Sequence, residues 1–362
     1  QLFIGDGRKP FKVAHLLKLQ GKQHEEVQSA VPGDICAVAK VDDLHFDAVL
    51  HDSHAEDHYH LSTLELQPPM CGVAIKTTRR GDEQKLSDSL HKLVAEDPSL
   101  RLDHRVALNE TVLYGAGDLH LRVVLERMRD QYNVDVETSP PSIAYRETIT
   151  APAEGHHRHK KQTGGAGQFG EVFLRVAPRE RGSGFEFVNK VVGGSIPYQF
   201  IPAVEKGVRQ VLDSGAIAGY PLQDIEVTVY DGKHHSVDSK EVAFVAAGKK
   251  AFLDAIHNAQ PIVLEPIVDA VIMTPADHVG DITGDLSSKR GLINGTSVLP
   301  QNRVQISAKV PLSEMDGYQS KLKSLTGGQG SFTMEFSHYE SVPAKVQHDL
   351  MAEFRPQVEA EG

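Results

Sequence analysis

Residues 71–96 read CGVAIKTTRRGDEQKLSDSLHKLVAE, and this stretch decides the fold class. Its first seven residues form a short apolar run, which predicts a strand. The part that follows carries apolar side chains at offsets of four, seven and eight residues, which is the spacing of one helical face: Leu86, Leu90, Leu93 and Val94. Pro98 then ends the helix. The stretch therefore predicts a strand followed by an amphipathic helix.

The chain continues this pattern and later repeats it. Residues 100–117 read as two strands joined by a turn, and residues 118–132 as a second helix. Strand, helix, strand, strand, helix is the order of the split βαβ unit of a ferredoxin-like domain. The C-terminal third has the same order, with a strand over 265–275, a helix over 276–291, a strand pair over 292–312, a helix over 314–328 and a strand over 330–343. Gly291 is predicted to end the first of these helices in the left-handed conformation.

The remaining segments predict two further domains. The middle of the chain alternates strands with helices, and the predicted elements are strands over 170–178, 184–194 and 223–232 and helices over 202–215 and 239–259. The N-terminal segment reads as short strands, among them 9–19 and a buried strand over 35–41. These strands are too few to close a barrel, so the barrel is expected to begin before residue 1. We predict an α+β multidomain protein with domains 1–67, 68–139, 140–262 and 263–362.

Composition limits the possible functions. The chain has 362 residues and a net charge of −11, which disfavours a general nucleic-acid binder but leaves room for a local basic patch. Its two cysteines, Cys36 and Cys71, are too few for a disulfide framework and are expected to be buried small apolar residues. With neither a membrane span nor a signal peptide, a cytoplasmic protein is expected.

The glycine-rich stretch TGGAGQFGEV, residues 163–172, resembles a phosphate cradle at first sight. A Walker loop needs Lys and then Ser or Thr after its last glycine, but Gly170 is followed by Glu171 and Val172. A dinucleotide fingerprint needs a helix at this point, whereas the next residues form a strand pattern. We therefore predict a glycine-rich hairpin or loop in which the backbone takes positive φ or makes a close approach.

Three polar clusters remain. His51, His54, Asp57 and His58 have the offsets of a metal site on a helix, but no apolar helical face accompanies them, so a solvated loop without metal is favoured. The run HHRHKKQ at 156–162 is either a solvated turn or an RNA contact. In YDGKHHSVDS at 230–239 a tight turn is predicted at Asp231 and Gly232, and no catalytic triad is evident.

Several segments together give a family resemblance. SIAYRETIT, TGGAGQFGEV, GYPLQDIEVTVYDGKHHSVDS, GDITGDLSSKRG and SLTGGQGSFTMEFSHYESVP, in this order, resemble bacterial elongation factor G. The resemblance implies part of domain II, a ferredoxin-like domain III containing YGAGDLHLRV, a ribosomal protein S5-like domain IV and a second ferredoxin-like domain V. It also implies that the VNKV stretch at 188–191 belongs to domain IV and does not read guanine.

The resemblance implies an RNA-contacting tip on domain IV. The tip residues are Gly164, Gly165, Gly167, Gln168, Lys233, His234 and His235. Basic residues beside the tip and on domain V are His157, Arg158, Lys160, Lys161, Lys289 and Arg290. The family pattern commonly has Arg where this chain has Ala166 and His where it has Glu171. Both changes remove positive charge and suggest a divergent paralogue.

The implied function is non-catalytic in this chain. The family's GTPase domain, with its GTP and magnesium, would precede residue 1. The implied partners are the ribosome, at the small-subunit decoding site and the large-subunit stalk base, and the moving transfer RNA and messenger RNA, with the protein acting as a monomer. A ribosome-recycling factor, a tetracycline-resistance ribosomal protection factor and a metal-binding accessory protein remain as alternatives.

Overall fold

The computed structural model describes residues 1–354 except for 22, 42, 63, 65 and 163–166. Residues 1–141 and 142–362 form two compact units, and each is described by itself. Among the helices described, none combines the length and the apolar character that crossing a membrane requires.

The N-terminal segment forms two small sheets. Strand β1 (Phe3–Ile4) pairs with β5 (Leu50–His51), and β2 (His15–Gln20) lies between β3 (Gln23–Glu26) and β4 (Ala37–Ala39). The prediction of a buried strand over 35–41 was wrong at its ends. Strand β4 is short and lies at the edge of its sheet, and Ile35 outside it is 93% exposed.

The second part of this unit is a ferredoxin-like domain. Its elements are β6 (Cys71–Thr77), α1 (Glu83–Glu96), β7 (Arg101–Arg105), β8 (Glu110–Gly115), α2 (Asp118–Tyr132) and β9 (Val136–Ser139). The strands are hydrogen-bonded in the order β7-β8-β6-β9. Leu86, Leu90 and Leu93 of α1 are buried in one cluster with side chains of α2, so the predicted helical face is confirmed. Cys71 is only half-buried, and its thiol donates a hydrogen bond to Asp118 at 3.1 Å.

The C-terminal part of the second unit repeats this architecture. Its elements are β15 (Pro261–Pro275), α5 (Val279–Ser288), β16 (Leu292–Leu299), β17 (Arg303–Pro311), α6 (Tyr318–Leu325), β18 (Ser331–Ser341) and α7 (Ala344–Glu353). The strand order is β16-β17-β15-β18, which matches that of the first ferredoxin-like domain. The α+β multidomain fold class is therefore confirmed. Short 3-10 helices lie at His54–Glu56, Val106–Leu108, Tyr198–Phe200, Ala276–His278 and Leu312–Met315.

The end of α5 differs from the prediction. Arg290, and not Gly291, takes the left-handed conformation, with φ of 58°. The backbone N–H of Gly291 donates to the carbonyl of Leu286 at 2.8 Å, which closes a Schellman motif. A Cβ at Gly291 would lie 2.7 Å from that carbonyl oxygen, so the glycine is needed for close approach.

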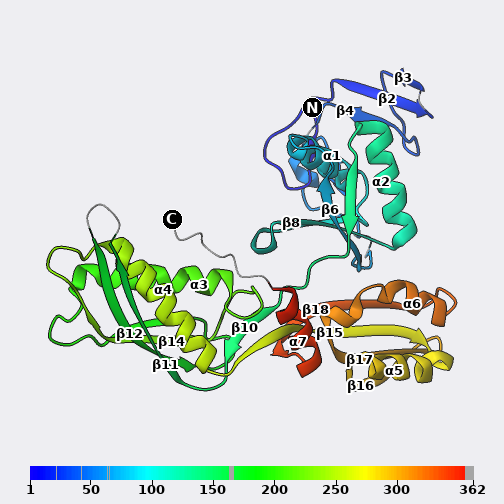
Figure 1. Cartoon of the computed structure of the whole chain (residues 1–362). Coiled ribbons are helices and arrows are strands. Elements are labelled where there is room, and N and C mark those ends of the chain that lie inside the picture. The colour runs from blue at the N-terminus through cyan, green and yellow to red at the C-terminus, as the bar shows by residue number, and fades with distance from the viewer. Residues whose placement is uncertain (22, 42, 63, 65, 163–166, 355–362) are drawn as a thin grey trace. The chain divides into compact units, whose positions relative to one another are not determined.

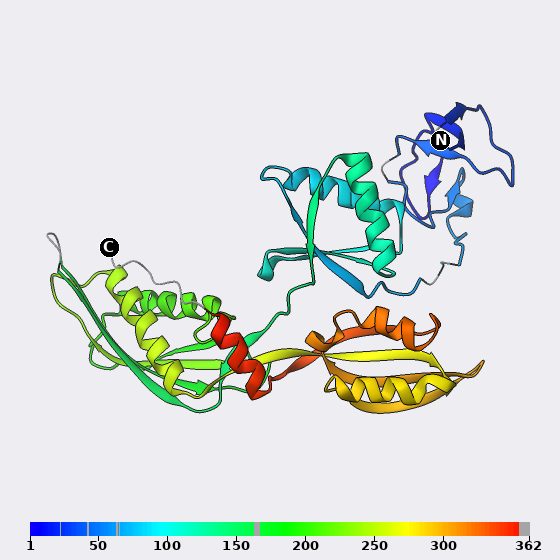
Figure 2. The same ribbon diagram turned by 45° about the vertical axis from the view of Figure 1, so that its right-hand side comes forward.

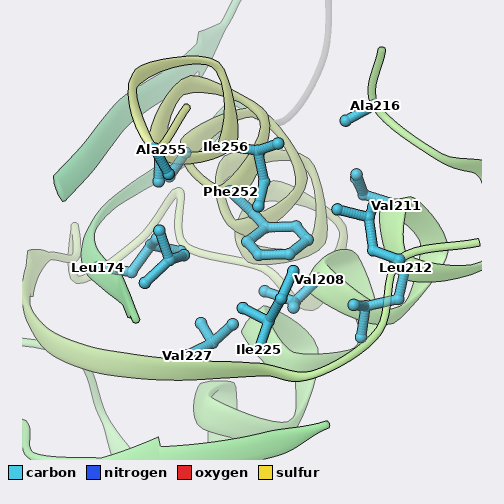
Figure 3. Packing of buried hydrophobic residues seen from close by; sticks show 14 of the residues in the cluster. Leu174, Val208, Val211, Leu212, Ala216, Ile225, Val227, Phe252, Ala255 and Ile256 are labelled. Carbon is cyan, nitrogen blue, oxygen red and sulfur yellow. The ribbon is translucent and has the colours of Figure 1, made fainter. Parts of the chain in front are cut away.

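The middle domain is a four-stranded sheet covered by two helices (Figures 1 and 2). Its elements are β10 (Arg146–Ile149), β11 (Ala153–Lys161), β12 (Gln168–Pro178), β13 (Glu186–Asn189), α3 (Ile201–Ser214), β14 (Ile225–Lys233) and α4 (Glu241–Asn258). The sheet order is β11-β12-β14-β13, and only the β13–β14 pair is parallel. In the core, the ring of Phe252 on α4 lies among Leu174 of β12, Ile225 of β14 and Val208 of α3 (Figure 3).

The structure excludes the turn alternative for the basic run at 156–162 and contradicts the turn predicted at Asp231 and Gly232. Residues 156–161 continue strand β11 and do not form a turn, because they pair with β12 as far as Lys161 and Gln168. Asp231 and Gly232 lie inside β14, which runs on to Lys233. The register shifts between Phe173 and Leu174, so this part of β14 carries an irregularity that resembles a turn in the sequence.

Strand β10 joins the sheet of the C-terminal domain. It pairs with Pro261–Leu264, the first residues of β15, while the rest of β15 pairs with β17 and β18. The predicted boundary between 262 and 263 thus lies within a single continuous strand.

Candidate nucleic-acid interface

Strand alternation gives the middle sheet two different faces. On β12, Val172, Leu174 and Val176 are fully buried in the core shared with α3 and α4. The residues between them face the opposite side, where Phe173 is half-buried and Arg175 is exposed. The same alternation runs along β11, so the sheet has one apolar face and one polar face.

The two loops predicted to form a tip meet at one end of this sheet. The backbone N–H of Phe169 donates to the carbonyl of Asp238 at 2.9 Å, and the hydroxyl of Ser239 donates to the carbonyl of Phe169 at 2.9 Å. The N–H of His235 donates to the same hydroxyl at 2.8 Å. These bonds fix the loop after β14 against the start of β12.

A pocket of about 200 Å³ lies at this junction. It is lined by Arg158, Lys160, Lys161, Gln162, Gly167, Gln168, Phe169, His235 and Asp238. The lining holds more cationic than anionic side chains, although the whole chain carries a net charge of −11. Clustered Lys and Arg attract phosphate, so the pocket suits an anionic group such as a nucleic-acid backbone.

The described glycines of the loop allow close approach. A Cβ on Gly167 would lie 2.8 Å from the carboxylate of Asp238, and one on Gly170 would lie 3.2 Å from the backbone of Ala243 on α4. Gly170 does not have positive φ. Gly164, Gly165 and Ala166 lie outside the described residues. Gln168 lies beside His159, with 3.1 Å between its Oε1 and the imidazole Nε2.

The three predicted tip residues at the end of β14 and directly after it, Lys233, His234 and His235, have different surroundings. The Nδ1 of His235 accepts backbone N–H groups of Val237 and Asp238 at 3.4 and 3.3 Å, which leaves Nε2 as the ring's donor. The Nδ1 of His234 lies 3.2 Å from the carbonyl of Ser195. Lys233 is 72% exposed at its side chain. Lys233 and His235 are thus available to a partner.

The predicted basic patch divides into separate groups. Arg158 and Lys160 are exposed on β11, and the guanidinium of Arg158 lies over the Phe169 ring at 5.2 Å. Burial, and after it the nearby Lys250, lowers the pKa of His157. His157 is therefore neutral at neutral pH and adds no charge to the patch.

Lys289 and Arg290 lie on the C-terminal domain and pair internally. Arg290 binds the carboxylates of Glu265 and Glu314, and hydrogen bonding to Glu265 raises its pKa. Lys289 donates to the carbonyl of Glu314 at 2.8 Å. Arg290 therefore contributes to the packing of this domain.

Glu171, the acidic departure from the family pattern, is a buried residue with a structural role. Its Oε1 lies 2.9 Å from His156 Nε2, and its Oε2 lies 3.9 Å from the Lys233 ammonium. Its side chain is only 8% exposed, so most of its charge is withdrawn from the surface.

Sequence reasoning missed Phe169 and Asp238 in the pocket. Phe169 reads as an ordinary strand residue, and its position over Arg158 depends on the pairing of β11 with β12. The spacing of Val172, Leu174 and Val176 was the available signal, because it places 169 and 171 on the outer face.

The histidine cluster near the N terminus is part of the fold. His51 is buried and its two ring nitrogens lie 2.6 Å from the carbonyl of Gly5 and 2.9 Å from that of Ser53. Within the part of the chain that the structure describes, no three His, Cys, Asp or Glu residues are grouped to hold a metal ion.

Comparison with known proteins gives three matches along the chain. The model for elongation factor G domain III matches residues 66–140, that for domain IV matches residues 141–260, and that for the elongation factor G C-terminus matches residues 262–350. The chain belongs to the elongation factor G family. In elongation factor G terms, the pocket lies on domain IV.

A solved structure is similar to this chain in sequence and fold. A crystal structure of a protein from Thermus thermophilus is 37% identical, with a TM-score of 0.77. The match covers 97% of this chain and 52% of that protein, so the chain spans about half of its length.

Proposed function

We propose that this chain is a ribosome-binding portion of an elongation factor G-like translation factor, and that its domain IV tip contacts RNA at the decoding site during movement of transfer RNA and messenger RNA. One observation carries the proposal. Two segments some 70 residues apart in sequence meet around a cationic pocket at the end of the sheet.

The chemistry of the tip supports RNA as the partner. Arg158, Lys160 and Lys161 supply positive charge for phosphates, and Gln168 and His235 supply neutral donors and acceptors. The arrangement needs no reaction at the tip. We propose that GTP and magnesium serve a GTPase domain of the parent protein, and that this chain contributes binding and positioning.

Directed cleavage of ribosomal RNA tests the placement. Cys36 and Cys71 are replaced by Ser, Ser236 in the tip loop is replaced by Cys, and an iron chelate attached there generates hydroxyl radicals on purified ribosomes. The expected result is cleavage of small-subunit RNA around the decoding site. Cleavage elsewhere, or none with a ribosome-bound chain, would contradict the proposal.

A charge comparison gives the second test. Replacing Lys160, Lys161 and Lys233 by Ala should weaken co-sedimentation with ribosomes and reduce its dependence on salt. The control is Lys206→Ala on α3, which removes a cation of similar exposure, 64% at the side chain, from the helical side of the same domain. Equal losses in both variants would contradict the tip assignment.

A further inference from the structure

The polar face of the domain IV sheet continues from the tip pocket as an ordered set of cationic and aromatic side chains. We call it the cation–aromatic face, and its members are His156, Arg158, Phe169, Phe173, Arg175 and Tyr230. They lie on three adjacent strands, β11, β12 and β14. Strand pairing brings them together, since His156 is opposite Phe173 and Lys160 is opposite Phe169.

The planar groups of His156, Arg158 and Arg175 each lie against an aromatic ring. The imidazole of His156 stacks on Phe173, with ring centroids 4.0 Å apart and an interplanar angle of 17°. Arg158 lies over Phe169 at 5.2 Å, and Arg175 lies over Tyr230 at 5.7 Å. The aromatic rings thus hold these planar groups in place on the solvent-facing side of the sheet.

Two carboxylates on this face are paired with its nitrogen-bearing side chains, while a third, Asp231 opposite Phe173, accepts the backbone N–H of Gly232. Glu154 binds Arg175 at 2.6 Å, and Glu171 binds His156 at 2.9 Å. Arg158 forms no ion pair with any residue that the structure describes, and it is exposed. The uncompensated positive charge therefore lies on β11, where it continues into Lys160 and the pocket.

We infer that the cation–aromatic face binds single-stranded RNA by stacking unpaired bases on His156 and Arg158. The inference rests on the proposed function in one respect, that domain IV contacts RNA. Bases stack on histidine rings and on arginine guanidinium planes, and the cations attract the adjoining phosphates. The positive charge of the face complements an RNA strand within an otherwise acidic chain.

The spacing favours a single strand over a duplex. His156 and Arg158 are two residues apart on one strand, so their side chains leave the backbone at points about 6.6 Å apart. Bases within a helical stack lie only about 3.4 Å apart. Two bases on these planes would therefore be splayed from each other, which an extended single strand permits and a duplex does not.

The test measures the affinity of the whole chain for a fluorescein-labelled oligouridylate by fluorescence anisotropy. We expect His156→Gln combined with Arg158→Ala to weaken binding by at least about tenfold. Glutamine keeps a donor for Glu171, so the buried carboxylate retains a partner. Arg158→Lys alone, which keeps the charge but removes the plane, should weaken binding several-fold, and an RNA duplex should bind more weakly than the oligouridylate.

Arg209→Ala is the matched control. Arg209 also lies over a phenylalanine, Phe185 at 5.0 Å, and pairs with Glu205 at 2.6 Å, but it is on helix α3. This variant should bind the oligouridylate within about twofold of the original chain. Circular dichroism of every variant establishes that the fold is retained, and Arg158→Lys carries the comparison if the double variant unfolds.

A spectroscopic readout separates stacking from charge attraction. The chain has no tryptophan, so His156→Trp introduces a single reporter on the face. Its fluorescence should be quenched by oligouridylate and not by an abasic strand of equal charge. The inference would be overturned if the double variant or Arg158→Lys bound with unchanged affinity. It would also be overturned if the abasic strand quenched the fluorescence equally or if the duplex bound equally well. If ribosome binding depends on the tip lysines while the face binds no RNA, the inference fails and the proposed function stands.

Discussion

The carboxylate of Glu147 on β10 accepts a hydrogen bond from the backbone N–H of Ala216 at 2.7 Å, although 69 residues separate the two. The same carboxylate accepts further bonds from the backbone N–H groups of Ile217, Ala218 and Tyr220. Glu147 is fully buried, so these four donors replace its hydration shell. One side chain thereby fixes the segment after α3.

Glu147→Gln should destabilise domain IV strongly. Glutamine has one carbonyl oxygen that can accept hydrogen bonds. Its NH2 group can only donate and would face backbone N–H groups, so some of these buried N–H groups would lose their acceptor. We expect a loss of about 3 kcal/mol in the free energy of unfolding, measured by urea denaturation. Glu180→Gln, at an exposed position of the same domain, is the control and should change little. Equal effects would show that the buried carboxylate has no special role.

Two glycine substitutions should act in opposite directions. A Cβ at Gly155 would overlap the carbonyl oxygen of Ala251, so Gly155→Ala must push α4 away from β11. We expect a loss of about 3 kcal/mol. Gly284 on α5 has open space around its Cβ position, so Gly284→Ala should stabilise the protein by about 0.5–1 kcal/mol. Thermal denaturation measures both variants. Destabilisation of both would indicate that alanine is poorly tolerated at glycine positions in general.

Arg290 combines a strained backbone with a buried partner. Glu265 is only 2% exposed at its side chain, and Arg290→Ala would leave it without this cation. We expect a loss of about 3–5 kcal/mol. Arg290→Gly should lose about 1 kcal/mol less, because glycine takes positive φ without the steric cost. Urea titrations of both variants measure the difference, and identical stabilities would exclude backbone strain at this position.

His51 makes the N-terminal segment sensitive to pH. Its two ring nitrogens face carbonyl oxygens, which only accept, so both hydrogen bonds form only when the ring is protonated. The hydrogen bond to Gly5, opposed by burial and aided by Ser53 and the nearby Asp57 and Glu56, raises the pKa of His51.

The sign of the pH effect follows from this raised pKa. The imidazolium stabilises the folded state fully below the ordinary histidine pKa of about 6.5, and this contribution is lost as pH rises through the folded pKa. Amide hydrogen exchange at Gly5 and His51, corrected for intrinsic rates, should therefore show less protection at alkaline pH. In His51→Gln the protection should not change with pH. A parallel loss in that variant would assign the effect to another group.

Much of the fold follows from periodicity. The leucines of α1 and the Val172, Leu174 and Val176 spacing of β12 are strong patterns, because each of these elements buries one face against a single core. The end of α5 could not be predicted in detail. A glycine is the usual left-handed residue, and only the carboxylates around Arg290 show why an arginine holds that position here.

The candidate site was harder to predict than the fold. Basic residues and glycines were visible in the sequence, but the contacts of His156 with Phe173 and of Arg158 with Phe169 depend on the register between β11 and β12. The irregularity in β14 adds a residue near Tyr230 that no local pattern specifies. Cross-strand neighbours are far apart in the sequence, so the sequence indicated which residues form the surface but not how they are arranged.

Strand β15 has a consequence for how this unit can be taken apart. Its first residues pair with β10, and the rest of the strand lies between β17 and β18 at the centre of the same sheet. The connection between the two domains is therefore a hydrogen-bonded strand. A protease that cuts exposed connecting peptides should cleave it poorly. Releasing one domain from the other there requires partial unfolding of a sheet, so the two should resist separation until that sheet melts.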